Sequence, residues 1–451
     1  MFPSEPDMND KLNRTTSDHP TTTRREVLRR GASASAALAA TVGASRMVHT
    51  QAASADPDRK IKIGIVGAGG RGTGAVNDSF SINDNIELVT IADLDPGNAE
   101  RLRTGMTRRH GDKINVADDR IHSGLDAYKA VLEDPEVEVV FLTTSPAFRP
   151  SHIAEAVKAG KHVFAEKPSC VDPAGYRICV AAHEEAKKNG TAIVTGTQYR
   201  RQSNYMEAVK RIHDGEIGDI IGMTSRYCSQ GIWYKNRAEG VSDTQYQLNN
   251  WMHFIWLSGD QIAEQAVHNI DLMNWVMQGP PVSAYGSGGR FTRPDDSEMW
   301  DSMSIDYMYS DERPVSFMCR QIPGSTAENG STVRGTKGFA IIGAGSSGST
   351  FLDRSGKETL KLEGSIADAY RQEHKDLIDS IRSGEAIVEL LETAKSSLTA
   401  VMGRMAAYTG KKVTWDFVAN ESELDLFPKD LQWDGSRPEP SYAIPGKTKL
   451  I

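Results

Sequence analysis

The sequence has few cysteines, no long apolar run and no strong excess of one charge. Its four cysteines, Cys170, Cys179, Cys228 and Cys319, have neither C-x-x-C spacing nor a histidine pattern beside them. We therefore expect no metal site and interpret them as buried apolar residues. No apolar run reaches the roughly 20 residues of a membrane span, and no repeat is visible. The formal net charge of -8 gives no electrostatic reason to expect nucleic acid as a partner.

What is present is the composition of an ordinary soluble globular protein, with 39% hydrophobic and 25% charged residues. A chain of 451 residues is long enough for two domains with full cores, or about three by length alone. From changes in pattern along the chain we expect a leader over residues 1–55, a first domain over 56–196, a second over 197–416 and a tail over 417–451.

The expected leader differs from the rest of the chain. A polar start leads into TRREVLR at 23–29, then a weakly apolar, alanine-rich run over 31–47, then Ala53-Ser54-Ala55, which fits a small-residue cleavage site. This order resembles a twin-arginine export signal, which implies a periplasmic location and the twin-arginine export machinery as a partner. The alternatives are a basic amphipathic helix, a chance pair of arginines, or a signal that stays uncleaved.

Short apolar runs alternate with helical patterns between residues 60 and 196. The runs that we expect to form strands are Ile61–Val66, Ile86–Ala92, Val137–Leu142, Val163–Ala165 and Ala192–Gly196. Such alternation predicts a doubly wound parallel sheet with helices on both faces, which is a Rossmann-type α/β fold.

After about residue 196 the pattern changes to alternating apolar and polar residues. Runs of this kind lie at 219–228, 282–291, 303–309, 313–322 and 332–342. They predict a mostly antiparallel sheet with one face buried. A helical segment over 251–277 interrupts them and two late helices follow, one of which carries Tyr370, His374 and Leu377. The second half is therefore expected to be α+β, with a tail that runs as coil over the surface.

A glycine cluster, Gly67-Ala68-Gly69-Gly70-Arg71-Gly72, follows the first predicted strand and matches G-x-G-x-x-G. The first glycine permits a tight turn, the second lets the backbone approach a pyrophosphate, and the third lets the next helix pack on the strand. Asp93 ends the second strand about 20 residues later, where a carboxylate can bind a ribose 2′-hydroxyl. These residues predict a dinucleotide site. NAD is favoured because a carboxylate repels a 2′-phosphate, although Arg71 keeps NADP possible.

Two further clusters carry charged side chains. The run AGKHVFAEKP places Glu166-Lys167-Pro168 just beyond a predicted strand, at the sheet edge where ligands of such folds bind; the alternative is a surface ion pair. The run EQAVHNID covers 264–271, and on a helix Glu264, His268 and Asp271 would share a face. The alternative there is a core histidine satisfied by one of the two carboxylates.

Together with Thr144-Ser145-Pro146 and His152, these motifs resemble the glucose-fructose oxidoreductase, inositol dehydrogenase and rhizopine-catabolism family, abbreviated Gfo/Idh/MocA, from about residue 60 to 416. The resemblance implies an N-terminal Rossmann domain and a C-terminal domain with an open-faced sheet that often mediates oligomers. It also implies NAD(P)-dependent chemistry on sugars or polyols. The cofactor contacts that it implies, besides the glycine cluster and Asp93, are Thr144, Ser145, Pro146, His152, Glu166 and Lys167.

The resemblance implies a catalytic set of Lys167, Glu264 and His268, with Glu264 standing where aspartate is usual. Hydride can leave a carbinol carbon only as the hydroxyl proton departs, so a base must lie near that oxygen. His268, with an ordinary pKa near 6.5, suits this task at neutral pH, and Lys167 can hold the developing alkoxide. Glu264 would then orient or charge-balance His268.

Weaker candidates for substrate contacts are Tyr199, Arg200, Asp271 and Trp251. Aromatic faces suit sugar rings, and six aromatics crowd the segment after the first strand of the second half: Trp233, Tyr234, Trp251, Trp256, Trp275 and Trp300. Most large aromatics are nevertheless core residues, so we expect only one or two to meet a ligand. The polar runs 198–201 and 235–237 are either substrate contacts or exposed loops.

The leading hypothesis is an NAD(P)-dependent oxidoreductase that transfers hydride from a sugar, polyol or sugar derivative. Export would separate the protein from the cytoplasmic pool of free NAD, so we expect the cofactor to be tightly bound. This expectation favours, as the alternative, a redox-neutral glycoside cleavage or epimerisation that regenerates the cofactor within one cycle. A third hypothesis is a binding scaffold with a degenerate site, and the presence of Lys167 and His268 argues against it.

Overall fold

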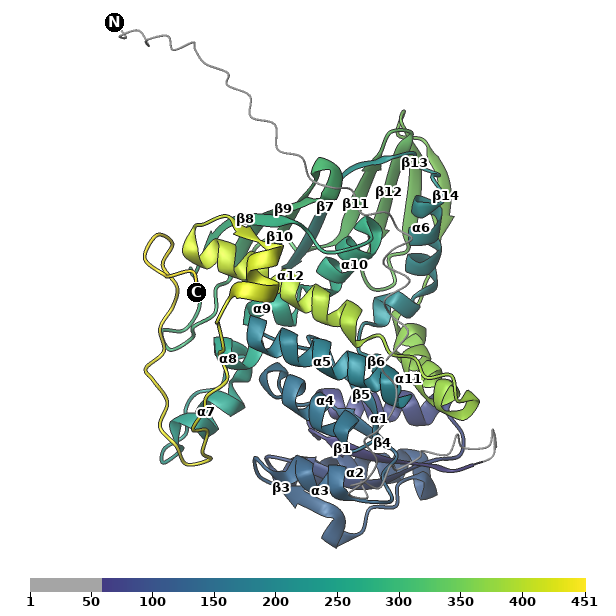
Figure 1. Ribbon diagram of the computed structural model, residues 1–451, viewed down its shortest axis with the longest axis vertical. Helices are drawn as coiled ribbons and strands as arrows, with labels where there is room; N and C mark the ends of the chain where they lie inside the picture. Colours follow the sequence, from purple (N-terminus) through teal and green to yellow (C-terminus); the bar gives the residue numbers. More distant parts are fainter. Residues whose placement is uncertain (1–58) are drawn as a thin grey trace, which may run out of the picture. The chain divides into compact units, whose positions relative to one another are not determined.

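Two sheets organise residues 59–451, which are the residues that the computed structural model describes (Figure 1). The expected leader lies outside them, and its export signal stays a prediction. The first sheet is parallel, with the strand order β3-β2-β1-β4-β5-β6. Its strands are β1 (Ile61–Val66), β2 (Ile86–Asp93), β3 (Ile121–Ser123), β4 (Val139–Leu142), β5 (His162–Ala165) and β6 (Ile193–Thr195). The predicted Rossmann-type α/β fold is confirmed.

Helices cover both faces of this parallel sheet. Residues of α1 (Gly70–Ile82), α2 (Pro96–His110) and α11 (Ile366–Ser383) share one core, and residues of α3 (Ala127–Glu133), α4 (Arg149–Lys158) and α5 (Pro173–Asn189) contribute to the other. Asp95 caps the start of α2, because its side chain accepts a hydrogen bond from the Gly97 amide, and Pro96 occupies the first position of the helix. Sequence-distant α11 thus returns to cover a sheet formed by the first part of the chain.

The second sheet has nine strands in the order β14-β13-β12-β11-β7-β10-β9-β8-β15. They are β7 (Ile220–Ser229), β8 (Ser283–Gly289), β9 (Ser302–Tyr309), β10 (Arg313–Gln321), β11 (Glu328–Gly335), β12 (Gly338–Gly343), β13 (Ser349–Asp353), β14 (Glu358–Leu362) and β15 (Val413–Thr414). All neighbours are antiparallel except β10 and β7, which are parallel. The expected mostly antiparallel sheet is confirmed, but the single run predicted over 332–342 is a hairpin of β11 and β12.

One face of the second sheet is buried by helices and the other is open (Figure 1). Along β9, Met303, Ile305 and Tyr307 are buried while Ser304 and Asp306 are exposed. The buried face meets α6 (Ser203–His213), α10 (Val267–Met277) and α12 (Leu390–Thr409), which lie on the side of the sheet that faces the Rossmann domain.

The helical segment predicted over 251–277 is broken into shorter helices. It contains α8 (Ile255–Ser258), α9 (Asp260–Glu264) and α10, and α7 (Asp243–Asn249) precedes it. Gly259 ends α8 in the left-handed region with a φ of 73°, which stops the helix from continuing. The helix α8 packs beside the turn Pro146–Phe148, which follows β4 at the carboxyl end of the parallel sheet.

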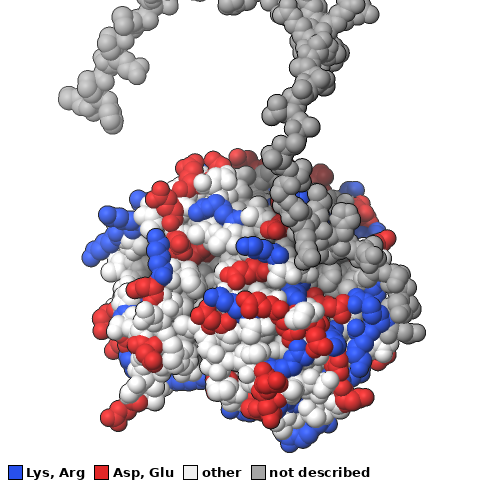
Figure 2. Space-filling model, turned by 60° about the horizontal axis from the view of Figure 1, so that its bottom comes forward, with Lys and Arg blue, Asp and Glu red and all other residues white. Residues whose placement is uncertain are grey.

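The tail runs as coil over the surface beyond a short helical turn at 417–421, and passes beside α7 and α8 in Figure 1. Within residues 59–451, no helix combines the length and the apolar character needed to cross a bilayer. All four cysteines are buried and free. On the face shown in Figure 2, side chains of both charges are interspersed over the described surface.

Candidate functional site

A cleft of about 530 Å³ opens at the carboxyl ends of the parallel strands. Half of the twelve residues predicted to contact a dinucleotide line it, whereas Gly70, Arg71, Gly72, Pro146, Glu166 and Lys167 do not. Those that line it are Gly67, Gly69, Asp93, Thr144, Ser145 and His152, together with Trp251, which was predicted for substrate. Open α/β sheets bind ligands at this edge.

The glycine turn has the geometry that a pyrophosphate cradle requires. Gly67 has a φ of +99°, and a Cβ on Gly72 would lie 2.0 Å from the Gly67 carbonyl oxygen. By contrast, a Cβ on Gly69 or Gly70 would have no atom within 4 Å, so the backbone there faces open space. No side chain caps the start of α1, and its first N–H groups are available to an anion. The residues present therefore fit the phosphates of a dinucleotide.

Asp93 is held rigidly at the end of β2. One carboxylate oxygen accepts a hydrogen bond of 2.5 Å from the Ala68 amide. The other accepts bonds from the Asp95 amide at 2.9 Å and from the Asn98 side chain at 3.0 Å. The acceptor predicted to meet a ribose is thus fixed beside the glycine turn.

Arg149 links the two loops that carry the family motifs, and no sequence motif marks it. Its guanidinium donates to the Thr144 carbonyl at 2.6 Å and to the Pro168 carbonyl at 2.7 Å. Burial lowers the pKa of Arg149 to about 10, which still leaves it charged at neutral pH. A cation that bridges two carbonyls fixes the spacing between Thr144 and the loop of Lys167.

His152 lies in α4 and lines the cleft as a neutral ring. It stacks on Tyr128 with 4.1 Å between ring centroids. Burial, followed by the charge of Arg149, lowers the pKa of His152 to about 3. The side chain therefore offers an uncharged flat surface to the cleft rather than a cation for phosphate.

Arg71 points to Glu166 instead of the cleft that holds Asp93. Its Nε lies 2.9 Å from Glu166 and its Nη2 lies 3.3 Å from Asp78, and its guanidinium covers the Tyr370 ring at 4.9 Å. A Cβ on Gly196 would lie 2.6 Å from Glu166, so glycine is required there. The ion pair joins the glycine turn to the Glu-Lys-Pro loop.

Lys167 pairs with Glu264, which was expected to orient His268 instead. The Lys167 ammonium donates to the Glu264 backbone carbonyl at 2.5 Å and to its carboxylate at 3.2 Å. Both side chains are largely buried. Neither residue lines the cleft, but Glu166, next to Lys167, forms the ion pair with Arg71 that joins this loop to the glycine turn.

His268 differs in two ways from its predicted setting. The turn between α9 and α10 separates it from Glu264, so the two do not lie on one continuous helix. Its Nδ1 has no hydrogen-bond partner among residues 59–451, while its ring packs against Tyr199 at 5.2 Å. Burial, followed by the charges of Lys167 and Arg71, holds the pKa of His268 well below its ordinary value. The histidine is therefore neutral at neutral pH, and its unpartnered Nδ1 is buried.

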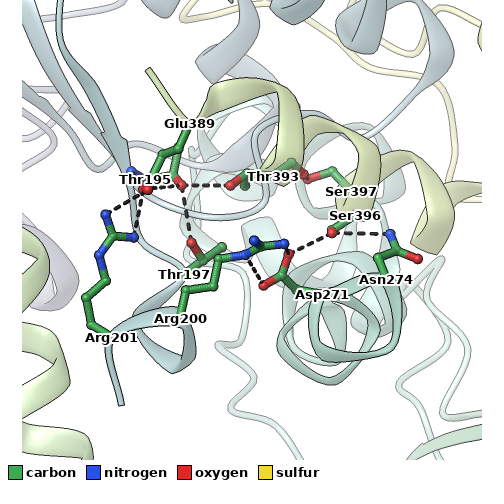
Figure 3. Close-up of polar contacts among 10 residues, drawn as sticks. All are labelled: Thr195, Thr197, Arg200, Arg201, Asp271, Asn274, Glu389, Thr393, Ser396 and Ser397. Carbon is green, nitrogen blue, oxygen red and sulfur yellow. Dashed lines mark hydrogen bonds and ion pairs between the residues drawn. The ribbon is translucent and has the colours of Figure 1, made fainter. Parts of the chain in front are cut away.

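Asp271 forms its side-chain hydrogen bonds with Arg200 and Ser396, and none with Glu264 or His268 (Figure 3). The Arg200 Nε and Nη2 donate to its two oxygens at 2.7 and 2.9 Å, and the Ser396 hydroxyl donates at 2.7 Å. Arg200 and Asp271 do not line the cleft. They join the turn after β6 to α10 and α12, and their predicted contact with substrate stays a prediction.

The same polar network fixes the end of β6. The Arg201 guanidinium donates to Glu389 at 2.7 and 3.0 Å, and the Glu389 carboxylate accepts from the Thr195 amide at 2.6 Å. Figure 3 shows these contacts between the turn after β6 and the start of α12. The network holds Tyr199, two residues before Arg201, against His268.

The aromatics of the 233–300 segment have different surroundings. Trp256 and Trp300 are buried, and Trp275 lies under Arg200 at 5.4 Å. Trp233 and Tyr234 are exposed, whereas Trp251 lines the cleft. Within residues 59–451, no group of three or more histidine, cysteine or carboxylate side chains could hold a metal ion.

Comparison with known proteins gives two adjoining family matches. Residues 61–195 match the model described as an oxidoreductase family with an NAD-binding Rossmann fold. Residues 205–341 match the GFO/IDH/MocA C-terminal domain.

Relatives and solved structures agree with these matches. The inositol 2-dehydrogenase/D-chiro-inositol 3-dehydrogenase of Lactiplantibacillus plantarum is 26% identical over 48% of this chain and 52% of the relative. The myo-inositol 2-dehydrogenase of Thermotoga maritima is 24% identical over 78% of this chain and 96% of the relative. The chain spans about half the length of several curated relatives that it matches.

Two solved structures share the fold. A levoglucosan dehydrogenase in complex with NADH and levoglucosan aligns with a TM-score of 0.63, 16% identity and coverage of 79% of this chain and 99% of that chain. The aldose-aldose oxidoreductase of Caulobacter crescentus aligns with a TM-score of 0.61, 19% identity and coverage of 79% and 100%. Because the two family models together match more than half of the chain, it belongs to the Gfo/Idh/MocA family of oxidoreductases.

Proposed function

We propose that the protein is an NAD-dependent oxidoreductase that acts on a hydroxyl-bearing carbon of a sugar, polyol or sugar derivative. The observation that carries this proposal is the ion pair of Lys167 with Glu264, on a loop that the ion pair of Arg71 with Glu166 joins to the glycine turn. The relatives named above as inositol, levoglucosan and aldose enzymes support the substrate class.

The charges around the cleft favour NAD over NADP. Asp93 would repel a 2′-phosphate, and Arg71, the cation that keeps NADP possible, forms ion pairs with Glu166 and Asp78. Arg101 lines the cleft but pairs with Asp95 at 3.4 Å. When bound, the nicotinamide supplies the hydride chemistry.

The protein's own side chains would manage the proton and the charge on oxygen. The Lys167 ammonium can donate a hydrogen bond to the reacting oxygen and stabilise negative charge on it. Neutral His268 can accept the hydroxyl proton on a ring nitrogen, although its lowered pKa makes it a weaker base than an ordinary histidine. Glu264 holds Lys167 in place, which differs from the expected pairing with His268.

A second candidate follows from the export signal expected over residues 1–55. A periplasmic enzyme could not exchange its nucleotide with a cytoplasmic pool, so a redox-neutral reaction with retained NAD would suit that location. Such an enzyme would oxidise one sugar carbon, eliminate or epimerise at a neighbouring position, and reduce the carbon again.

One experiment separates the candidates. The purified full-length protein is denatured, the released nucleotide is identified by mass spectrometry, and native protein is incubated with inositols, aldoses and glycosides while reduced nicotinamide is followed by absorbance. Net reduction of added NAD supports the dehydrogenase. Stoichiometric bound NAD with altered glycoside and no net reduction supports the redox-neutral route. Absence of any nucleotide binding rejects both.

Variants assign the chemistry. Lys167→Ala should lower turnover by at least about a hundred- to a thousandfold, the usual loss when one charge-stabilising donor is removed, and should leave nucleotide bound. Lys158→Ala, an exposed lysine on the neighbouring helix α4, is the matched control and should turn over normally. Normal turnover in Lys167→Ala would remove Lys167 from the mechanism.

A further inference from the structure

The nucleotide cleft has an outer wall that does not come from the Rossmann domain. Lys235 and Trp251 flank α7, and Trp433 belongs to the tail, yet all three line the same cleft as Gly67 and Asp93. We call Lys235, Trp251 and Trp433 the outer wall. We call the part of the cleft that the Rossmann domain lines, which includes Gly67 and Asp93, the inner side. The Rossmann fold explains the inner side but not the presence of the three outer-wall residues.

The part of the outer wall around α7 is held in a defined conformation. The Lys235 amide donates to the Asn250 side chain at 2.9 Å, and the Asn250 amide group donates to the Lys235 carbonyl at 2.8 Å. The Asn250 side chain is buried. This reciprocal pair of hydrogen bonds closes the loop between residues 235 and 250. It fixes the backbone at Lys235 and beside Trp251.

The tail is fastened to the same loop around Trp433. The Ser242 hydroxyl donates to the Trp433 carbonyl at 2.8 Å, and the Gln245 side chain donates to Asp434 at 2.6 Å. Thr244 donates to the Gly435 carbonyl at 3.2 Å. These contacts explain why the tail lies beside α7 in Figure 1, and they fix the backbone rather than the indole of Trp433.

A second contact ties the tail to the cleft itself. Phe427 packs edge-on against Phe148 with 5.4 Å between ring centroids, and Phe148 lines the cleft. The Trp433 residue remains 39% exposed. Trp433 therefore lines the cleft without filling a core.

The chemistry of the outer wall matches a dinucleotide. Two indoles can stack on flat base or ribose surfaces, and the Lys235 ammonium, which lies over the Trp233 ring at 5.4 Å, can neutralise phosphate charge. The acidic residues Asp93 and Asp95 on the inner side face the hydroxyls of a ribose better than phosphates. The arrangement places donors for phosphate and acceptors for ribose on different parts of the cleft.

We propose that Lys235, Trp251 and Trp433 bind the dinucleotide, so that the C-terminal tail helps to retain the cofactor in its Rossmann site. This inference rests on the proposed function, because it takes NAD as the ligand. On this proposal, release of the cofactor requires the tail to move away from α7, or the nucleotide to pass Trp433.

The test measures retention rather than turnover. Full-length protein is loaded with NADH, free nucleotide is removed, and the loss of bound NADH fluorescence is followed against a competing excess of NAD. Trp433→Ala should raise the dissociation rate about tenfold, since stacking on a base is worth about 1–3 kcal/mol, and Trp433→Phe should restore most of the retention. Lys235→Ala should raise the dissociation constant and make it less sensitive to salt.

Tyr442→Ala is the matched control, because Tyr442 is an aromatic of the same tail that is 51% exposed and does not line the cleft. It should release NADH at the rate of the unchanged protein. In the unchanged protein, hydrogen exchange of residues 430–437 should slow when NAD is bound. This measurement does not depend on whether a variant folds. If Trp433→Ala and Lys235→Ala retain NADH normally, or exchange is unaffected, the inference is wrong while the proposed function stands. If the unchanged protein binds no dinucleotide, both are wrong.

Discussion

His374 lies in the core of the Rossmann domain as an isolated polar side chain. Neither of its ring nitrogens has a hydrogen-bond partner among residues 59–451, and its ring packs near Phe141 and Phe164 at 5.2 and 4.1 Å. Burial, followed by the charges of Arg71 and Arg201, holds the pKa of His374 well below its ordinary value. The folded protein therefore keeps this histidine neutral in mild acid.

This lowered pKa predicts a loss of stability in acid. Below a pH of about 6.5 the unfolded chain binds a proton at this position that the folded chain does not, so the free energy of unfolding falls as the pH decreases. His374→Leu should flatten this fall by up to about 1.4 kcal/mol per pH unit. Urea unfolding at several pH values between neutrality and mild acid measures the slope.

The control for this measurement lies on the same helix. Leu377→Ala removes fully buried apolar atoms and should lower stability at every pH by about 2–5 kcal/mol, without altering the slope. An unchanged slope in His374→Leu would show that other groups carry the acid sensitivity.

At the residue scale, motif-bearing side chains could be predicted and their supports could not. Lys167 and Glu264, which contact each other, could be named as candidates because each belongs to a recognisable sequence motif. Arg149 bridges two of these loops, but a single arginine in a helix gives no pattern from which two specific carbonyl partners can be inferred. The pairing of Asp271 with Arg200 was likewise invisible, because helical spacing shows which residues share a face but not what packs against it.

The turn from β1 into α1 is the element that the rest of the cleft is built around. Its glycines divide into those that tolerate a side chain and those that do not. A Cβ on Gly72 would collide with the Gly67 carbonyl oxygen at 2.0 Å and with the Thr143 hydroxyl at 2.8 Å. A Cβ on Gly70 would meet no atom within 4 Å.

Gly72→Ala should therefore separate α1 from β1. Overpacking of this kind typically costs about 1–3 kcal/mol, and we expect the upper end because the clash is with backbone. Gly70→Ala is the matched control: it should keep or slightly raise the stability, since alanine favours the helix. Thermal unfolding without added nucleotide compares the two. Equal transition temperatures for both variants would contradict the assigned role of Gly72.

At the element scale, the longer apolar runs predicted the strands correctly, whereas short strands and short breaks were missed. The strands β1, β2, β4, β5 and β6 follow from apolar runs, whereas β3 has only three residues at the sheet edge and resembles a loop. The run over 332–342 keeps its alternation through a tight turn, so β11 and β12 looked like one strand. The break between α9 and α10 spans two residues that do not disturb the helical spacing.

At the scale of the whole molecule, late segments complete structures begun early in the chain. The helix α11 covers the Rossmann sheet, and Arg201 in the turn after β6 pairs with Glu389 before α12. Sequence order therefore predicts the two sheets but not these returns, because contacts between distant segments leave no local pattern. The nucleotide cleft depends on the same principle, since the tail supplies Trp433.

The outer face of the second sheet exposes apolar side chains on strands β7, β8 and β12. Ile221, Tyr285 and Ile341 are 49%, 59% and 41% exposed. A hollow of about 790 Å³ on this face is lined by charges of both signs, Asp306, Glu312, Arg334 and Lys412. A surface that is apolar in part and carries both charges can pair with itself across a two-fold axis, where basic groups of one copy face acidic groups of the other.

A second copy of this chain is the occupant that we expect on that face, as the family resemblance implies. Tyr285→Glu and Ile221→Glu each place a charge where two apolar surfaces would meet, and burying an unpaired charge is costly. Both variants should shift the protein towards monomer in sedimentation velocity measurements. Met206→Glu, which changes an equally exposed side chain on α6 (50% exposed), should leave the oligomer intact. A monomeric unchanged protein, or an oligomer that survives both sheet variants, would place the assembly surface elsewhere.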